Sequence, residues 1–136
     1  YGDWSSDVCS SDLYVMAKKI LIVDDSSLIR NVAQNAAVEA GYQVVLAANG
    51  AEGLALLEKG GIDLIFSDIN MPVMNGLEMV EKIRELEHYK FTPIVMLTTE
   101  SKPELKEQGK TLGVKAWFLK PFNKEKFLLV LSKLLG

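Results

Sequence analysis

The feature that most constrains the fold of this chain is a short apolar run that ends in an aspartate. Residues 64–66 are Leu-Ile-Phe, and the run ends at Asp68. An uncharged run of this kind predicts a strand buried on both faces. Because a carboxylate is costly inside such a core, we expect Asp68 at the carboxyl end of the strand. The Met-Pro and Asn-Gly pairs at 71–72 and 75–76 then indicate a loop. Open α/β sheets bind ligands at such strand ends, although an ordinary strand-capping aspartate gives the same local pattern.

Apolar runs and helical patterns alternate along the rest of the chain. Besides residues 64–66, the apolar runs occupy residues 20–23, 42–48, 94–97 and 114–119. A helical pattern follows each run, for example over residues 28–40, where Gly41 ends it, and over residues 75–87. Five strand–helix units with short connections predict an α/β fold with a doubly wound parallel sheet and helices on both faces. An eight-unit barrel does not fit, and the glycine-rich motifs of nucleotide sites are absent.

Capping residues predict where helices begin. Two pairs have capping-box spacing and one residue can cap the last helix: Asn75 with Glu78, Ser101 with Glu104, and Asn123. The fourth helix has the weakest pattern, because only Leu105 and Leu112 are strongly apolar and Gly109 lies inside it. A polar helix with an internal glycine suits a surface that must reorganise.

Composition excludes several classes of protein. The chain has 136 residues and is 49% hydrophobic, which suffices for one domain with a real core. Its single cysteine, Cys9, excludes a disulfide framework and a multi-cysteine metal site. The single histidine, His88, has polar neighbours and is expected at the surface, so no zinc site or catalytic triad is predicted. No apolar run approaches the roughly 20 residues of a membrane span. The net charge of −3 argues against a nucleic-acid surface.

Residues 1–15 differ in character from the rest. They repeat Ser-Ser-Asp and carry three aspartates and no base, so the remainder has 15 acidic and 15 basic residues. They lack the basic start and apolar centre of a secretory signal. Because residues 16–19, Met-Ala-Lys-Lys, look like a natural start, we expect 1–15 to be non-native or disordered and 16–136 to form the domain. A native extension is the alternative. We expect no room for a DNA-binding module.

Five polar side chains follow four of the expected strands. In chain order they are Asp24 and Asp25, Asp68, Thr98, and Lys120. Because parallel strands end at the same edge of a sheet, we expect these side chains to lie close together. Each one alone is weak evidence, since capping acids are common and a lysine before a proline is usually solvated. Together they favour a functional site.

Four motifs around these residues resemble the receiver domains of bacterial two-component response regulators, most closely the stand-alone chemotaxis (CheY-like) type. They are Ile-Leu-Ile-Val-Asp-Asp-Ser at 20–26, Asp-Ile-Asn-Met-Pro-Val-Met-Asn-Gly at 68–76, Val-Met-Leu-Thr-Thr-Glu at 95–100 and Lys-Pro-Phe at 120–122. The resemblance covers residues 18–136. It implies a flavodoxin-like (βα)5 fold with strand order 2-1-3-4-5. Strand 2, which carries no candidate residue, then lies at an edge.

The acidic residues are expected to hold a metal ion. Two adjacent carboxylates and a third would repel one another without a cation. Mg²⁺ prefers oxygen ligands and commonly lies between carboxylates and a phosphate. The resemblance implies that Asp24, Asp25, Asp68 and the backbone carbonyl of Asn70 bind Mg²⁺, with Mn²⁺ as a substitute.

The resemblance also assigns the reacting groups. Asp68 is expected to accept a phosphoryl group from the phosphohistidine of a sensor kinase, which later hydrolyses. Lys120 and Mg²⁺ would neutralise the phosphoryl oxygens, and the Thr98 hydroxyl would donate a hydrogen bond to one of them. The peptide bond before Pro121 is expected to be cis.

Trp117 departs from the family, in which Tyr or Phe usually occupies this position. The family's ring turns inward when the residue corresponding to Thr98 moves, and this couples the site to the output face. Because overfilling a packed pocket costs about 1–3 kcal/mol, we expect an outward indole before phosphorylation. A partly exposed residue that never moves is the alternative.

We therefore expect a phosphorylation-activated signalling switch and not a turnover enzyme. Its expected partners are a sensor histidine kinase or phosphotransfer protein, and a target such as a flagellar motor switch or another effector. The target would bind the face formed by the fourth helix, which contains Leu105 and Gly109, the strand over residues 114–119, and the final helix, which Asn123 caps. We expect a cytoplasmic monomer without nucleic-acid or membrane binding, in chemotaxis or another pathway.

Two alternatives remain. A phosphohydrolase would commonly carry an acid two residues after the nucleophile, but Asn70 cannot protonate a leaving group. A degenerate receiver would bind partners without phosphorylation.

Overall fold

The computed structural model describes residues 18–69, 74–99 and 103–135. The five strands form one parallel sheet in the order β2-β1-β3-β4-β5. Their bounds are β1 Lys19–Val23, β2 Gln43–Ala47, β3 Leu64–Asp68, β4 Ile94–Thr98 and β5 Ala116–Leu119. The helices are α2 Ser27–Glu39, α3 Gly50–Glu58, α4 Gly76–Glu85, α5 Pro103–Thr111 and α6 Lys124–Leu135, with a short 3₁₀ helix, η1, at Glu87–Tyr89. The doubly wound parallel sheet is confirmed, and β2 lies at an edge as predicted.

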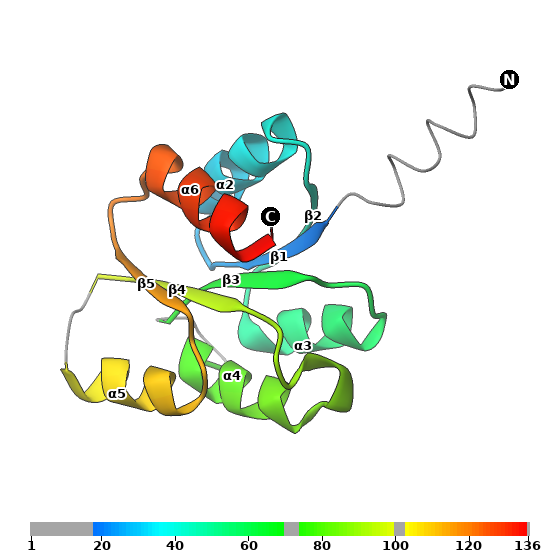
Figure 1. The fold of residues 1–136 in the computed structure, drawn as a ribbon, viewed down its shortest axis with the longest axis vertical. Helices are drawn as coiled ribbons and strands as arrows, with labels where there is room; N and C mark the ends of the chain where they lie inside the picture. Colours follow the sequence, from blue (N-terminus) through cyan, green and yellow to red (C-terminus); the bar gives the residue numbers. More distant parts are fainter. Residues whose placement is uncertain (1–17, 70–73, 100–102, 136) are drawn as a thin grey trace, which may run out of the picture.

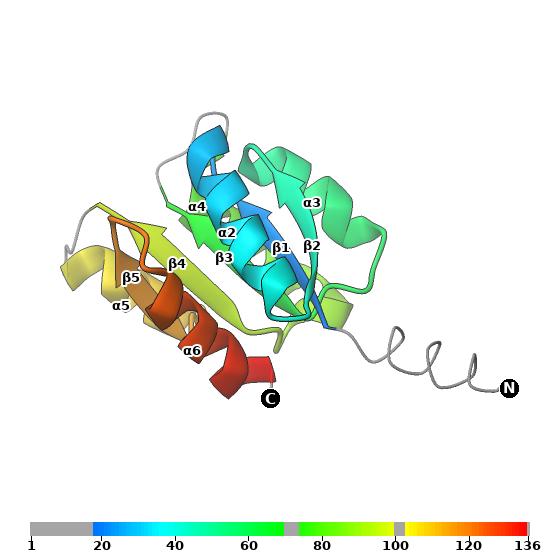
Figure 2. The same ribbon diagram turned by 90° about the horizontal axis from the view of Figure 1, so that it is seen from above.

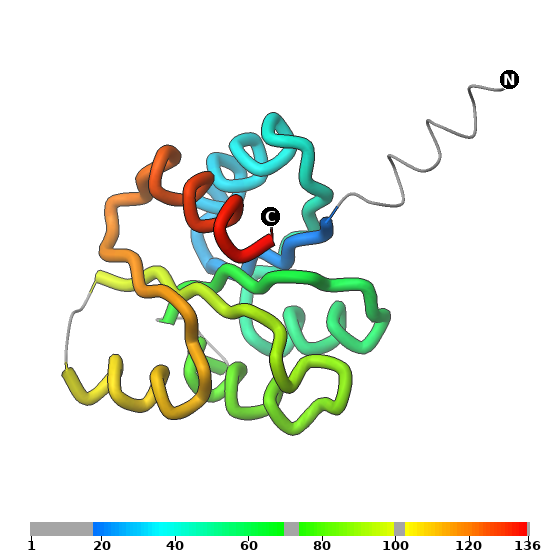
Figure 3. Tube along the Cα trace, viewed as in Figure 1, coloured from blue at the N-terminus to red at the C-terminus, as the bar shows by residue number. Residues whose placement is uncertain are grey.

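The helices cover both faces of the sheet. Helices α2 and α6 lie side by side on one face, and α3, α4 and α5 lie on the other (Figures 1 and 2). The tube in Figure 3 shows how the helices between successive strands return the chain to the start of the next parallel strand. Two separate apolar cores result, one on each side of the sheet. The site described below lies at the strand ends that border both cores.

The central strands are buried because the helices leave neither face open. Every residue of β3 and β4 is buried, including Ser67, Asp68 and Thr98. The buried Ser67 hydroxyl donates a hydrogen bond to the carbonyl of Asp68 at 2.8 Å. The uncharged run at 64–66 therefore occupies the position that its sequence predicts, with Asp68 as the last residue of the strand.

Several helix starts follow the predicted caps. Asn75 and Glu78 form both hydrogen bonds of a capping box at α4. The Asn123 side chain accepts a hydrogen bond from the backbone of Lys126 at the start of α6. Ser101, which begins the other predicted capping box, lies outside the described residues. Residues 1–15 lie outside them as well.

The helix predicted over residues 75–87 is shorter than expected. Helix α4 ends at Glu85, because Leu86 has an extended backbone and the chain enters η1. The Arg84 guanidinium stabilises this break by donating hydrogen bonds to the carbonyls of Tyr89, Thr92, Leu112 and Gly113. All four acceptors lie outside α4, so the helical pattern of residues 75–87 does not predict these hydrogen bonds. Among the described helices, none has the length and apolar character that crossing a membrane requires.

Candidate functional site

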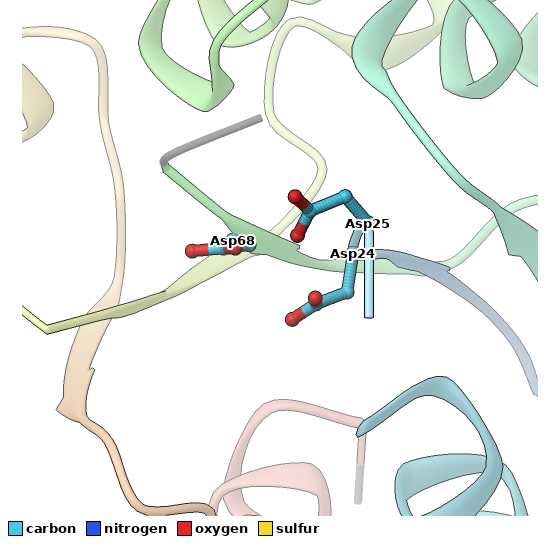
Figure 4. A group of neighbouring side chains, drawn as sticks. All are labelled: Asp24, Asp25 and Asp68. Atoms are coloured by element: carbon cyan, nitrogen blue, oxygen red, sulfur yellow. The ribbon is translucent and has the colours of Figure 1, made fainter. Parts of the chain in front are cut away.

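Three carboxylates lie together at the carboxyl edge of the sheet. Asp24 and Asp25 follow β1, and Asp68 ends β3, its immediate neighbour in the sheet. One carboxylate oxygen from each residue lies within 4.8 Å of the other two. Figure 4 shows the three side chains beyond these strand ends. Asp24 and Asp68 are 1% and 2% exposed, whereas Asp25 is exposed to solvent. We call these three residues the acidic site.

Asp24 is held in place by hydrogen bonds from its own turn and from the neighbouring elements β2 and α2. Its backbone N–H donates to the carbonyl of Ala47 at 3.1 Å, and its Oδ1 accepts from the backbone N–H of Ser26 at 2.8 Å. Its carbonyl accepts a hydrogen bond from the Arg30 guanidinium at 2.6 Å. The sequence did not predict the contact of Ser26 with Asp24 or any role for Arg30. Because these contacts depend on the turn geometry, residue spacing does not predict them.

The other oxygen of the Asp24 carboxylate is in an unusual environment. Asp24 Oδ2 is buried, and no described residue donates a hydrogen bond to it. The Lys120 ammonium forms an ion pair with it at 4.0 Å. Burial, with the carboxylates of Asp68 and Asp25, raises the pKa of Asp24 from 3.8 to about 6, although the Ser26 N–H opposes this change. The site therefore disfavours the charge that a carboxylate normally carries at neutral pH.

Lys120 brings a positive charge to the acidic site. It follows β5 directly, and its ammonium donates to Asp68 Oδ2 at 3.3 Å. The predicted cis bond between Lys120 and Pro121 is confirmed. The next residue, Phe122, packs its ring on Phe66 and Phe127, with centroids 6.1 and 5.2 Å apart. The loop that carries Lys120 is therefore anchored to β3 and α6.

Thr98 and Trp117 line a cavity beside this site. Thr98 is the last residue of β4 and is 1% exposed. The residue before it, Leu97, pairs with Asp68 of the neighbouring strand β3. The cavity has a volume of about 480 Å³, and Lys120 also lines it. The structure thus brings Asp68, Thr98 and Lys120 to one edge, as predicted. Asn70, the predicted carbonyl ligand, lies outside the described residues.

The indole of Trp117 lies against the middle of α5. Its side chain is half-buried and packs on the core between the sheet and α3, α4 and α5. A Cβ atom at Gly109 of α5 would overlap Cζ2 of the indole and lie 3.1 Å from Cε2. The ring therefore contacts α5, and the expected outward bias of the indole before phosphorylation stays a prediction. The space exists because residue 109 has no side chain.

The chemistry of the donors fits Mg²⁺. The acidic site offers carboxylate oxygens, which Mg²⁺ prefers, and the Lys120 ammonium balances only part of their charge. The buried Asp24 Oδ2 accepts no hydrogen bond from the described residues and has the Lys120 ammonium 4.0 Å away, so this oxygen could serve as a ligand to a metal ion.

The chain is similar to known proteins in sequence and in fold. The model of the family described as the response regulator receiver domain matches residues 20–132. The chemotaxis protein CheY homolog of Campylobacter jejuni is 38% identical over 120 residues, which cover 87% of this chain and 92% of that protein. A probable transcriptional regulator, ycf29 of Porphyra purpurea, is 28% identical, and the match spans 88% of this chain but 57% of that regulator. The solved structure of Vibrio cholerae CheY4 has a TM-score of 0.83 and 48% identity, covering 87% of this chain and 98% of that chain.

Proposed function

Because the chain belongs to the response regulator receiver domain family, we propose that it is a signalling switch activated by phosphorylation of Asp68. The observation that carries this proposal is the buried Asp68 carboxylate, which lies 3.3 Å from the Lys120 ammonium and beside two further carboxylates. A nucleophile, a cation and a candidate metal site thus occupy one strand edge. Phosphoryl transfer depends mainly on such positioning and charge neutralisation.

The proposed transfer has a simple balance. An oxygen of Asp68 attacks the phosphorus of a phosphohistidine on a sensor kinase or phosphotransfer protein. The P–N bond breaks, its electron pair returns to the imidazole, and an acyl phosphate forms on Asp68. The Lys120 ammonium, 3.3 Å from Asp68 Oδ2, would neutralise a phosphoryl oxygen, and the Thr98 hydroxyl is the proposed donor to another. When bound, Mg²⁺ or Mn²⁺ supplies further charge neutralisation, and Asp24, Asp25 and Asp68 are the residues that would hold it.

Hydrolysis ends the proposed signal. Water attacks the phosphorus, the bond to the Asp68 oxygen breaks, and inorganic phosphate leaves. Because the domain then regains its free carboxylate and has changed only its own phosphoryl group, we propose a switch and not a turnover enzyme.

Intact mass spectrometry tests the acceptor. The full chain is incubated with Mg²⁺ and acetyl phosphate, and we expect the mass of one phosphoryl group to be added. Asp68→Asn and omission of Mg²⁺ should each abolish labelling. The control is Glu58→Gln, an equivalent change at an exposed residue of α3. Labelling that survives Asp68→Asn would refute the acceptor, and a wild-type protein that is never labelled would support a phosphorylation-independent receiver.

We propose that the target binds the face formed by α5, β5 and α6. Residues 103–135 carry seven lysines and three glutamates, whereas the described residues before them carry seven bases and eleven acids. Lys106 and Lys126 line the cavity beside Trp117. This charge favours an acidic segment of a partner, such as a flagellar motor switch protein or another effector.

Phosphotransfer profiling against the sensor kinases of the source organism would identify the kinase that phosphorylates this domain. The cytoplasmic location and the monomeric state stay predictions from the sequence.

A further inference from the structure

Arg30 lies at a place in α2 that is unfavourable for a cation. It is one turn beyond the cap residue Ser26, to whose carbonyl its backbone N–H donates at 3.1 Å. The N-terminal end of a helix carries a partial positive charge, so a guanidinium there is repelled. The first turn of α2 has no acidic residue that would offset this charge. The helix itself therefore does not explain the arginine.

The guanidinium instead contacts the backbone of the acidic site. Nη1 of Arg30 donates to the carbonyl of Asp24 at 2.6 Å, across the start of α2. The side chain is partly buried, and no carboxylate among the described residues forms an ion pair with it. Holding a long side chain in one conformation costs entropy, and this short charge-assisted hydrogen bond offsets that cost.

This hydrogen bond fixes the orientation of one peptide plane. The Asp24 carbonyl belongs to the planar peptide unit that joins Asp24 to Asp25. On its other side, the N–H of Asp24 donates to Ala47 of β2, and Oδ1 accepts from the N–H of Ser26. With Arg30 on the carbonyl, the backbone is held on both sides of the Asp24 α-carbon.

The Asp25 carboxylate depends on that plane. It is exposed, and no residue within the described ranges forms a hydrogen bond or an ion pair with it. One of its oxygens nevertheless lies within 4.8 Å of oxygens of Asp24 and Asp68. Because the side chain has no such contact of its own, its position follows from the backbone that carries it. A change in the orientation of the peptide plane would therefore move Asp25 relative to the other two carboxylates.

We propose that Arg30 is a positioning residue of the metal site, which holds the Asp24–Asp25 peptide plane so that both carboxylates face one divalent cation. The inference deepens the proposed function and rests on it for the presence of the metal. Arg30 acts through the backbone and does not itself bind the metal or the phosphoryl group.

Positioning and charge predict opposite effects of Arg30. A guanidinium close to the site repels a cation, so an arginine that acted only through its charge would weaken metal binding, and its removal would strengthen it. Removing a group that orients metal ligands typically lowers metal affinity by about 10–100-fold. The direction of the change in affinity therefore distinguishes the two roles.

Mn²⁺ binding to the full chain tests the positioning role, with free Mn²⁺ measured by electron paramagnetic resonance. We expect Arg30→Met, which removes the donor, to raise the dissociation constant about tenfold or more. Arg30→Lys should bind Mn²⁺ more tightly than Arg30→Met, because an ammonium can still donate to the Asp24 carbonyl. Lys133→Met removes an equal charge at an exposed residue of α6 and should leave the dissociation constant unchanged.

Three outcomes would overturn the role of Arg30. The first is an Arg30→Met dissociation constant equal to or below that of the wild type. The second is an Arg30→Lys variant that binds no better than Arg30→Met. The third is a wild type that binds no Mn²⁺, which would refute the metal site as well. Circular dichroism checks that each variant is folded, and Arg30→Gln replaces Arg30→Met if that variant is not.

The labelling of Asp68 by acetyl phosphate separates positioning from a general structural defect. Arg30→Met should be labelled more slowly than the wild type at limiting Mg²⁺, and the difference should shrink as Mg²⁺ approaches saturation. A deficit that is equal at all Mg²⁺ concentrations would overturn the positioning role. If Arg30→Met loses Mn²⁺ affinity as expected but the wild type is never labelled, the proposed function fails while the role of Arg30 at the metal site stands.

Discussion

At the scale of single residues, the carboxyl of Asp24 links the acidic site to the stability of the domain. Its pKa is raised from 3.8 to about 6, mainly by burial, so the folded domain binds this proton more tightly than the unfolded chain does. The contribution of Asp24 to stability is therefore most favourable below about pH 4 and is lost as the pH rises through about 6. A change of the pKa from 3.8 to about 6 corresponds to about 3 kcal/mol.

Asp24→Asn should consequently stabilise the metal-free protein. We expect its free energy of unfolding at about pH 7.5 to exceed that of the wild type by up to about 3 kcal/mol, and the difference to shrink toward about pH 4. Urea unfolding in EDTA at several pH values measures this. Glu58→Gln should show no such trend. A loss of stability from Asp24→Asn that is equal at all pH values would contradict the assigned pKa.

Lys120→Met should slow the labelling of Asp68. Removing one group that stabilises developing charge typically lowers a rate by about 10²–10³-fold, and the Lys120 ammonium contacts Asp68 directly. The rate of phosphoryl incorporation from acetyl phosphate at saturating Mg²⁺ is the measurement. Lys126→Met is the matched control, because Lys126 lines the same cavity from α6. Equal rates for the wild type and Lys120→Met would exclude this role.

The residues of the site could be predicted because topology does most of the placing. Once the strands are known to be parallel, Asp24, Asp68 and Lys120 must end at the same edge. The contact of the Trp117 ring with α5 could not be predicted in this way, because the missing side chain of Gly109 makes room for the indole.

At the scale of elements, an aromatic cluster connects the loop of Lys120 to the strand of Asp68. Phe122 packs on Phe66 of β3 and on Phe127 of α6. Phe122→Ala should therefore lower the free energy of unfolding by about 2–3 kcal/mol, somewhat less than for a fully buried ring, and should also slow the labelling of Asp68. Phe91→Ala is the matched control, because Phe91 is 91% exposed, and should change stability by less than about 0.5 kcal/mol. Urea unfolding and the labelling rate distinguish the two variants, and identical behaviour would show that the cluster does not position Lys120.

The ends of elements were predicted less well than their existence. Capping side chains act locally, so Asn75 and Asn123 mark the starts of α4 and α6 correctly. The early end of α4 depends on hydrogen bonds from Arg84 to the carbonyls of Thr92, just before β4, and Leu112, just after α5. Helical periodicity does not connect these residues.

At the scale of the whole molecule, the domain boundary predicted near Met16 can be tested. A chain starting at Met16 should keep the melting temperature and the labelling rate of the full chain, because the described sheet and helices begin at Lys19. Thermal unfolding and intact mass spectrometry on both chains are the measurements. A clear decrease in either quantity would show that residues 1–15 belong to the domain.

The overall fold was predictable because its pattern repeats. Five apolar runs alternate with five helical patterns, and a buried parallel sheet is the arrangement that satisfies all of them. The strand order came from the family resemblance, since many orders would satisfy the same alternation.

The uneven distribution of charge between residues 103–135 and the rest of the described chain gives the domain an electric dipole. A dipole orients a molecule during diffusion, so the acidic partner proposed above would meet α5, β5 and α6 more often than an uncharged one. The association rate should therefore fall steeply as ionic strength rises past about 0.1 M, where the Debye length is about 10 Å. The lifetime of the complex, which depends on short-range contacts, should change much less. A signal carried by this domain would then depend on how fast it finds its target before its phosphoryl group is hydrolysed.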